Sequence, residues 1–263
     1  EKYKDSSMEK KKEVFKEIHD LLGGNIKLFI SGAASLEPSI EEKFRRLGFN
    51  MVQGYGLTET SPVVAIGNKK YHKTGSIGKC VPSDEVKLLD INKDGIGELA
   101  VKGPNVMLEY YENKEATEKV LKDGWFQTGD LARIDEEGYI FICGRKKSVI
   151  VLKNGKNIFP EEMETLINKE DGVEESFIFG KPISKDPNDI KIFVKIVYNK
   201  ESFEGKTETE IKEYFNEKIK SINKTMPHYK AIRGIIISDK PLIKTTTNKI
   251  KREKNLEQII KEL

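Results

Sequence analysis

The chain has 263 residues, of which 37% are hydrophobic and 34% charged, an ordinary composition for one large globular domain or two smaller ones. Its 46 basic and 43 acidic residues are spread along the chain, which argues against the clustered basic face of a nucleic-acid-binding protein. Cys80, Cys143 and the three histidines lack the spacing of a disulfide framework or a zinc site. We therefore expect a cytoplasmic protein. The apolar runs are too short for a transmembrane segment, and peripheral membrane contact stays open.

The first 70 residues alternate between helix and strand patterns. Apolar residues recur at helical spacing over residues 9–22 and again over 38–47, where Pro38 stands near the start of the predicted helix. Short apolar runs at 26–30 and 51–52 predict strands. This strand–helix–strand order predicts a parallel sheet and an α/β fold.

From about residue 75 the pattern is that of an antiparallel sheet. Gly-rich turns at 92–95 and 135–138 separate short apolar segments, and their glycines can adopt a positive φ. Four strands are predicted, at 85–89, 98–102, 131–135 and 139–143, with one helix at 114–122.

A third pattern begins after Gly144. We predict a helix that starts at 157–160, followed by alternating strands and one strongly amphipathic helix. The strands are expected at 176–179, 191–198 and 232–237, and the amphipathic helix carries Ile211, Phe215, Ile219 and Ile222. The chain is therefore divided into residues 1–144, the end of a large α/β domain with an antiparallel β subdomain, and residues 145–263, a small α+β domain.

Residues 54–60 form the first stretch with the composition of a ligand site. Gly54 and Gly56 allow close backbone approach to a ligand, and Tyr55 between them offers a face for a planar base. Thr58 can donate to a phosphate oxygen, and the Glu59 carboxylate can hold Mg²⁺. The alternative is a strand-to-loop turn whose polar residues only satisfy the backbone.

Two further stretches are weaker signals taken singly. In residues 125–130, Asp130 follows a tight Gly turn, where a carboxylate suits the two hydroxyls of a ribose, although ordinary turns share this pattern. In residues 144–147, Arg145 can reach the same ribose or a phosphate and Lys147 stands where a hinge would be. The alternative for this second stretch is a basic linker.

The lysine-rich segment at 244–252 also has two interpretations. It has the composition of a solvated loop or a fraying tail. A lysine on a mobile loop can also be brought to developing negative charge at a reaction centre and then withdrawn.

Taken together, five stretches resemble, in order, the later motifs of the adenylate-forming family, which includes acyl-CoA synthetases, nonribosomal-peptide adenylation domains and luciferases. The resemblance extends from about residue 24 to residue 255 and is closest to long-chain fatty acid–CoA ligases. The five stretches are residues 54–59, 97–103, 128–130, 144–147 and 244–252.

The resemblance implies a two-step reaction. A carboxylate attacks the α-phosphate of ATP to give an acyl-adenylate and pyrophosphate, with Mg²⁺ as cofactor. The thiol of coenzyme A then attacks the acyl carbon of the adenylate, which gives acyl-CoA and releases AMP. Thr58 would bind the α-phosphate and Glu59 the Mg²⁺. The adenine would be bound by residues of two neighbouring turns, namely Gly32, Ala33, Ala34, Tyr55 and Gly56.

The remaining roles are implied by the same resemblance. Asp130 would hold the ribose hydroxyls with help from Arg145, and Lys249 would bridge the carboxylate and the α-phosphate during adenylation. Lys147 would be the pivot about which the small domain swings, and Gly155 would then face the pantetheine tunnel of coenzyme A. The alternative for Gly155 is an ordinary hairpin turn.

Two residues depart from the family pattern. Asn248 precedes the proposed catalytic lysine where the family usually has Gly, and Ser148 follows the hinge where many relatives have Asp. Asn tolerates the left-handed backbone region, so the turn is expected to survive.

The family's Ser/Thr/Gly-rich phosphate loop would lie upstream of all these motifs. The chain opens with Glu1 and has its first Met at Met8. We therefore expect the C-terminal portion of a longer fatty acid–CoA ligase, inactive without the upstream part of the same enzyme. The alternatives are an acyl carrier protein synthetase, another carboxylate-adenylating enzyme, and a non-catalytic C-terminal binding module.

Overall fold

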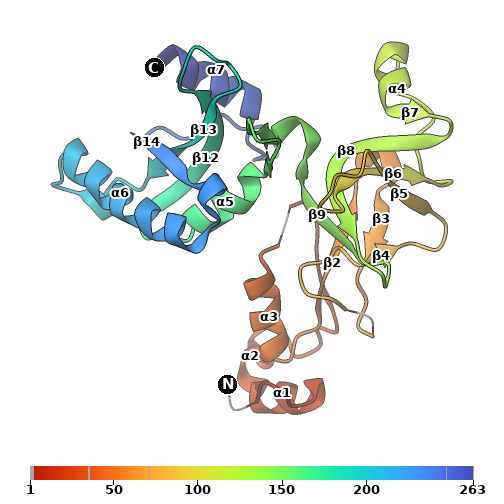
Figure 1. Cartoon of the computed structure of the whole chain (residues 1–263). Helices are drawn as coiled ribbons and strands as arrows, with labels where there is room; N and C mark the ends of the chain where they lie inside the picture. Colours follow the sequence, from red (N-terminus) through yellow and green to blue (C-terminus); the bar gives the residue numbers. More distant parts are fainter. Residues whose placement is uncertain (1–2, 35, 71, 247, 263) are drawn as a thin grey trace. The chain divides into compact units, whose positions relative to one another are not determined.

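The chain divides into two units, Glu1–Lys146 and Lys147–Leu263, and each is described by itself. The computed structural model describes residues 3–34, 36–70, 72–246 and 248–262. Figure 1 colours the first unit from red to green and the second from green to blue.

The first unit begins with two short helices, α1 (Met8–Val14) and α2 (Lys16–Leu21), where one helix was predicted. The backbone leaves the helical region at Phe15, with φ −101° and ψ 28°. Helices gain most of their stability by packing an apolar face, and the face expected here stays largely open, with Leu21 86% exposed. The prediction of one continuous helix is therefore wrong.

A four-stranded sheet follows, in the order β1-β2-β3-β4, with α3 (Pro38–Arg46) between its first two strands. β1 and β2 are parallel and pair Phe29 with Met51, which confirms the predicted parallel arrangement, although β1 is shorter than expected. The other pairs are antiparallel. The strands are β1 (Phe29–Ser31), β2 (Met51–Gly56), β3 (Val63–Ile66) and β4 (Lys79–Cys80), with the short 3-10 turn η1 (Thr58–Thr60) after β2.

The second sheet of this unit is antiparallel throughout, as predicted. Its order is β5-β6-β8-β7, with β9 also on β8. Its elements are β5 (Glu85–Leu89), β6 (Gly97–Lys102), α4 (Lys114–Val120), β7 (Leu121–Lys122), β8 (Trp125–Ile134) and β9 (Ile140–Arg145). Alternate residues of β8 are buried, among them Phe126, Thr128, Asp130 and Ala132. A carboxylate thus lies on the buried face of the strand.

The second unit is built on a three-stranded sheet, β12-β13-β14, between two helical layers (Figure 1). Ile178 and neighbours on one face pack against α5 and α6, whereas Phe177 and Phe179 on the other face pack against Ile259 of α7. Adjacent strand residues point to opposite faces, so both faces are apolar. The 3-10 turn η2 (Lys146–Ser148) contains the boundary between the two units. The other elements are β10 (Ile150–Val151), β11 (Asn157–Ile158), α5 (Pro160–Ile167), β12 (Val173–Pro182), β13 (Ile190–Tyr198), η3 (Glu201–Phe203), α6 (Glu208–Thr225), η4 (His228–Lys230), β14 (Ile232–Ser238) and α7 (Arg252–Glu262).

Most predicted elements of this unit are confirmed, and two differ. Asn157 and Ile158 form strand β11 instead of a helix start, because they pair with β10, and α5 begins only at Pro160. Helix α7 was not predicted at all. The α/β and α+β composition of the two units matches the expected fold class. In the parts of the chain that the structure describes, no helix has the length and apolar character needed to cross a bilayer.

Candidate functional site

Asp130 of β8 lies directly opposite Arg145 of β9 in the ladder register. Its side chain is 6% exposed, and Arg145 Nε lies 2.8 Å from its Oδ1 atom. Arg145 also donates from Nη1 to the carbonyl of Thr128 at 3.4 Å, while half of its side chain stays exposed. The pair therefore places a buried carboxylate next to an accessible cation.

Tyr55, at the end of β2, reaches the same carboxylate from the other sheet. Its Oη donates to Asp130 Oδ2 at 2.5 Å, and its ring packs against the core formed by Ala65, Leu99 and neighbours. Burial raises the pKa of Tyr55 far above its usual value, and the negative charge of Asp130 raises it further. Tyr55 consequently stays a neutral donor across the physiological pH range.

Asp130 lies within strand β8, which corrects the expectation of a carboxylate on a turn. Gly129 has φ +72°, and the β8–β9 register shifts after Leu131, so the strand is locally irregular. The Gly129 N–H donates to Glu98 Oε1 at 3.2 Å, and Thr128 Oγ1 accepts from the Asp130 N–H at 3.1 Å. These bonds fix the backbone that carries Asp130.

Glu98 was not recognised as a functional residue in the sequence. It is buried in β6, and while Oε1 holds Gly129, its Oε2 accepts from Lys146 Nζ at 2.6 Å. The hydrogen bond that Lys146 donates to Glu98 raises the pKa of Lys146. Glu98 lies in the motif at 97–103, and its place in that motif was the available signal. Its contact with Gly129 was not predictable from the sequence.

The loop after β2 is shaped by close backbone contacts. A Cβ atom on Gly56 would lie 1.6 Å from the carbonyl oxygen of Pro62, so no other residue fits at this position. Buried Thr60 accepts from the Leu57 N–H at 3.0 Å and donates to the Pro62 carbonyl at 2.7 Å. The loop therefore presents Thr58, which is exposed, in a fixed backbone conformation.

Glu59, also in η1, is half-buried and accepts a hydrogen bond from Tyr110 Oη at 2.8 Å. Burial and Glu59 together raise the pKa of Tyr110 to about 12. Within the described ranges, no group of three or more His, Cys, Asp or Glu side chains is arranged so that it could hold a metal ion. A lone carboxylate nevertheless suits Mg²⁺ that is bound mainly by nucleotide phosphates and water.

The turn at residues 32–34 follows β1 and is exposed. Gly32 lies against β2, since a Cβ atom on it would be 3.3 Å from the Gly54 carbonyl oxygen. Ala33 has φ +68°, an uncommon conformation for a residue with a side chain. The structure thus brings this turn beside the strand end that carries Tyr55.

In the second unit, the segment with Lys249 forms a closed hairpin rather than a fraying tail. Lys244 and Ile250 form an antiparallel bridge, and Thr245 donates to the Lys249 carbonyl at 2.8 Å. Asn248 has φ +64°, the left-handed conformation expected from the sequence. Lys249 is exposed beside it, and Thr247 lies outside the described residues.

Lys147 and Gly155 are also in the second unit. Lys147 is exposed in η2. Gly155 has φ +75° in the turn between β10 and β11, and no atom of another described residue lies within 4 Å of the position of a Cβ. The tight turn alone accounts for this glycine, so a coenzyme A contact is not needed to explain it.

The structure therefore brings together Tyr55, Asp130 and Arg145, with the turn at 32–34 beside the end of β2 and the loop at 57–60 directly after it. Tyr110, like Glu98, was missed, because nothing in its sequence surroundings pairs it with Glu59. Lys147, Gly155 and Lys249 belong to the other unit.

Two family models match the chain. Residues 4–111 match the AMP-binding enzyme model, and residues 147–263 match the AMP-binding enzyme C-terminal domain. The long-chain-fatty-acid–CoA ligase of Salmonella typhimurium is 38% identical over 187 residues, which cover 68% of this chain and 33% of the relative. The ligase of the same name from Bacillus subtilis is 38% identical over 65% of this chain and 32% of its own length. The chain thus spans about a third of the length of these relatives.

Solved structures show the same fold. The o-succinylbenzoate CoA synthetase of Bacillus subtilis, in complex with its acyl-adenylate intermediate, has a TM-score of 0.71 at 26% identity and covers 90% of this chain and 49% of its own. ATP-bound MatB from Rhodopseudomonas palustris has a TM-score of 0.69 at 28% identity, over 89% and 46%. The fold is that of adenylate-forming enzymes. The chain belongs to the AMP-binding enzyme family.

Proposed function

We propose that this chain is the C-terminal portion of an ATP-dependent fatty acid–CoA ligase. Such an enzyme joins a fatty acid to the AMP part of ATP as an acyl-adenylate with release of pyrophosphate, and then transfers the acyl group to coenzyme A with release of AMP. The relatives named long-chain-fatty-acid–CoA ligase support the fatty acid as substrate. The observation that carries the proposal is the convergence of Tyr55 and Arg145 on the buried Asp130 carboxylate.

Asp130 suits a ribose because a carboxylate can accept from two neighbouring hydroxyls at once. Tyr55 and Arg145 orient the carboxylate in advance, so little ordering is needed when a nucleotide binds. Tyr55 and Gly56 end β2, and the turn at 32–34 lies beside that strand end, so we assign these residues to the adenine.

The exposed Thr58 hydroxyl is assigned to the α-phosphate. Glu59 is assigned to Mg²⁺, which would neutralise phosphate charge when it is bound. Tyr110 holds one oxygen of Glu59, so the carboxylate has a fixed direction before a metal arrives.

The second unit supplies the groups proposed to act in turn. Lys249 would neutralise charge shared by the fatty acid carboxylate and the α-phosphate as the acyl-adenylate forms. Lys147 is proposed as the pivot, and the Gly155 turn as the part that meets the pantetheine of coenzyme A in the second step.

The test uses the complete enzyme that contains this chain, with Asp130→Asn as the variant. We expect fatty-acid-dependent ATP–pyrophosphate exchange to fall at least about 100-fold, because the ribose loses an anionic acceptor. Asp94→Asn, on an exposed turn, is the matched control and should leave exchange unchanged. Wild-type exchange in the Asp130→Asn variant would contradict the assignment of the ribose site.

The substrate is tested separately on the wild-type enzyme. Exchange is measured with long-chain fatty acids, o-succinylbenzoate and malonate, and loading is measured with coenzyme A against acyl carrier protein. Exchange only with another acid, or loading only of the carrier protein, would refute the fatty acid–CoA assignment. No exchange with any acid would favour a non-catalytic binding module.

A further inference from the structure

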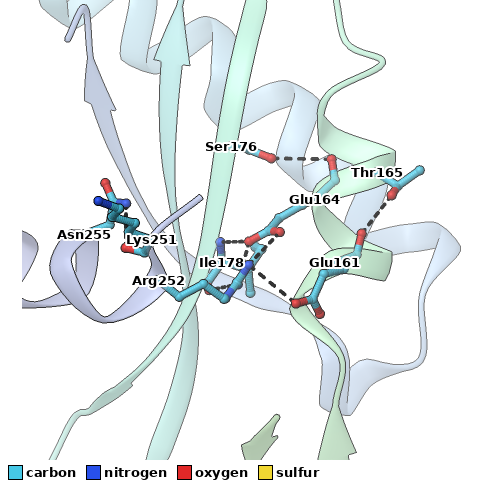
Figure 2. A network of polar contacts seen from close by, with 8 residues as sticks. All are labelled: Glu161, Glu164, Thr165, Ser176, Ile178, Lys251, Arg252 and Asn255. Atoms are coloured by element: carbon cyan, nitrogen blue, oxygen red, sulfur yellow. Dashed lines mark hydrogen bonds and ion pairs between the residues drawn. The ribbon is translucent and has the colours of Figure 1, made fainter. Parts of the chain in front are cut away.

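Arg252 is the first residue of helix α7, three residues after Lys249, and forms a salt bridge with a buried glutamate of another helix (Figure 2). Its Nη1 and Nη2 atoms donate to the two carboxylate oxygens of Glu164 on α5, at 3.0 and 2.8 Å. Nη2 also donates to the Ile178 carbonyl on β12 at 3.0 Å. One guanidinium thus ties the start of α7 to a helix and a strand.

The residues around Arg252 and Glu164 hold both side chains in place. Glu164 is 6% exposed, and its Oε1 also accepts from the Ile178 N–H at 2.7 Å. Burial raises the pKa of Glu164, and Arg252 acts in the opposite direction. The guanidinium also lies over the Phe177 ring, 4.8 Å from its centroid. A planar fork with two aligned donors fits this place, whereas a lysine ammonium would supply one point of attachment.

A second carboxylate, that of Glu161, also lies near the Arg252 guanidinium. Glu161 Oε1 lies 3.7 Å from Arg252 Nη1. Its Oε2 atom is buried and has no hydrogen-bond donor among the described residues. Removing Arg252 would therefore leave two carboxylates without their shared cation.

The base of the Lys249 hairpin is held on its other side by Asn255, also on α7. Asn255 Oδ1 accepts from the Ile243 N–H at 2.9 Å, and its Nδ2 donates to the carbonyls of Ile243 and Lys251, both at 2.9 Å. Both arms of the hairpin are therefore joined to α7, and α7 is joined to α5 and β12 through Arg252.

We infer that Arg252 is a positioning residue for adenylation, which holds the Lys249 hairpin at a fixed place on the second unit. This inference rests on the proposed function of Lys249. Helix α5 itself is anchored by Met163 and Ile167, both buried in the core, so it keeps its place without Arg252. Loss of Arg252 should consequently loosen the hairpin while the β10–β11 turn before α5 stays where it is.

This asymmetry predicts unequal effects on the two half-reactions. In the complete enzyme, Arg252→Met should lower kcat of adenylation by about 10- to 100-fold with little change in KM, since a displacement on the order of 1 Å costs about that much. Transfer of a supplied acyl-adenylate to coenzyme A should fall less than about threefold. Arg252→Lys keeps the charge without the fork and should fall between wild type and Arg252→Met.

Glu162→Gln is the matched control. Glu162 lies on α5, as Glu164 does, and pairs with Lys230 at 2.7 Å, but among the described residues it makes no contact with the hairpin. Lys249→Ala is the reference. If Lys249→Ala leaves adenylation intact, the proposed function fails. Suppose instead that Lys249→Ala abolishes adenylation. The positioning inference alone then fails if Arg252→Met has the same activity as Glu162→Gln, or if Arg252→Met lowers both half-reactions equally.

Hydrogen exchange of this chain gives a readout independent of catalysis. The Thr245 and Lys249 amides, bonded across the hairpin, should exchange at least tenfold faster in Arg252→Met than in Glu162→Gln, with α5 amides unchanged. Glu164→Gln removes the charge but keeps the shape, and should show the same pattern if Arg252→Met does not fold. Equal protection in all variants would overturn the inference.

Discussion

The bond from Tyr55 to Asp130 joins the two sheets of the first unit, and Tyr55→Phe removes it without changing the ring. A hydrogen bond to a charged group contributes about 1.5–3 kcal/mol. The short 2.5 Å contact and the buried acceptor favour the upper half of that range. With a urea m-value of about 2 kcal/mol/M, the unfolding midpoint should fall by about 1 M.

Trp125 makes this measurement specific, because it is the single tryptophan of the chain and lies on β8 of the same unit as Tyr55. Its fluorescence in urea reports unfolding of the first unit. Tyr111→Phe is the control, since Tyr111 is 87% exposed, and should change stability by less than about 0.5 kcal/mol. Equal midpoints for the two variants would refute the reasoning.

The pH dependence gives a second check. The pKa of Tyr55 is raised in the folded protein, mainly by burial, so its contribution to stability is complete below the unfolded pKa of about 10. Above that pH the unfolded chain ionises first, and the wild type loses stability that Tyr55→Phe does not. The difference between the two proteins should therefore be constant from pH 6 to 9 and shrink above pH 10. A difference that grows above pH 10 would have the wrong sign.

Three further predictions concern single backbone or side-chain positions. Lys249→Ala in the complete enzyme should lower ATP–pyrophosphate exchange by about 100- to 1000-fold and keep most transfer of a supplied acyl-adenylate to coenzyme A; equal loss of both would remove Lys249 from its role. Gly56→Ala should destabilise the first unit by about 3 kcal/mol or more, measured by Trp125 fluorescence, because its methyl would overlap the Pro62 carbonyl. Asn248→Val should cost about 1–2 kcal/mol in the left-handed turn and speed amide exchange at Lys249, whereas Asn248→Gly should not; identical exchange would contradict the turn geometry.

Elements with strong periodicity and a real packing partner were predictable. The amphipathic helix α6 buries Ile211, Phe215, Ile219 and Ile222, the residues that its spacing marked. The pattern at residues 9–22 was as regular, yet the described part of the chain offers its apolar face too little to pack against, and the helix breaks at Phe15. Periodicity reports an apolar face and not the surface that covers it.

The two elements missed in the second unit, α7 and β11, have other causes. A lysine-rich composition hid α7, although Leu256 and Ile259 stand at helical spacing and pack on the Phe177 face of the sheet. The many charged residues of this segment favoured a solvated loop over a helix based on these apolar positions. β11 was missed because pairing with β10 depends on a turn at Gly155 and not on local propensity.

For the site, residue types were predictable and contacts were not. Tyr55 and Asp130 were assigned separate roles in the sequence, and their direct hydrogen bond joins residues 75 positions apart. Nothing local in either segment encodes such a contact, because it depends on how two sheets meet. The same holds for Tyr110 with Glu59 and for Glu98 with Gly129.

Asp130 and Arg145 are paired across β8 and β9, and this pairing limits where residues can be inserted into the chain. Because side chains alternate between the faces of a strand, one residue inserted into β9 would bring a neighbour opposite Asp130 and turn Arg145 to the other face. The turn tips at Gly95 and Gly138 have open space around them instead. An affinity tag or a fluorescent label therefore belongs at those tips, where added chain leaves the register of the sheet intact.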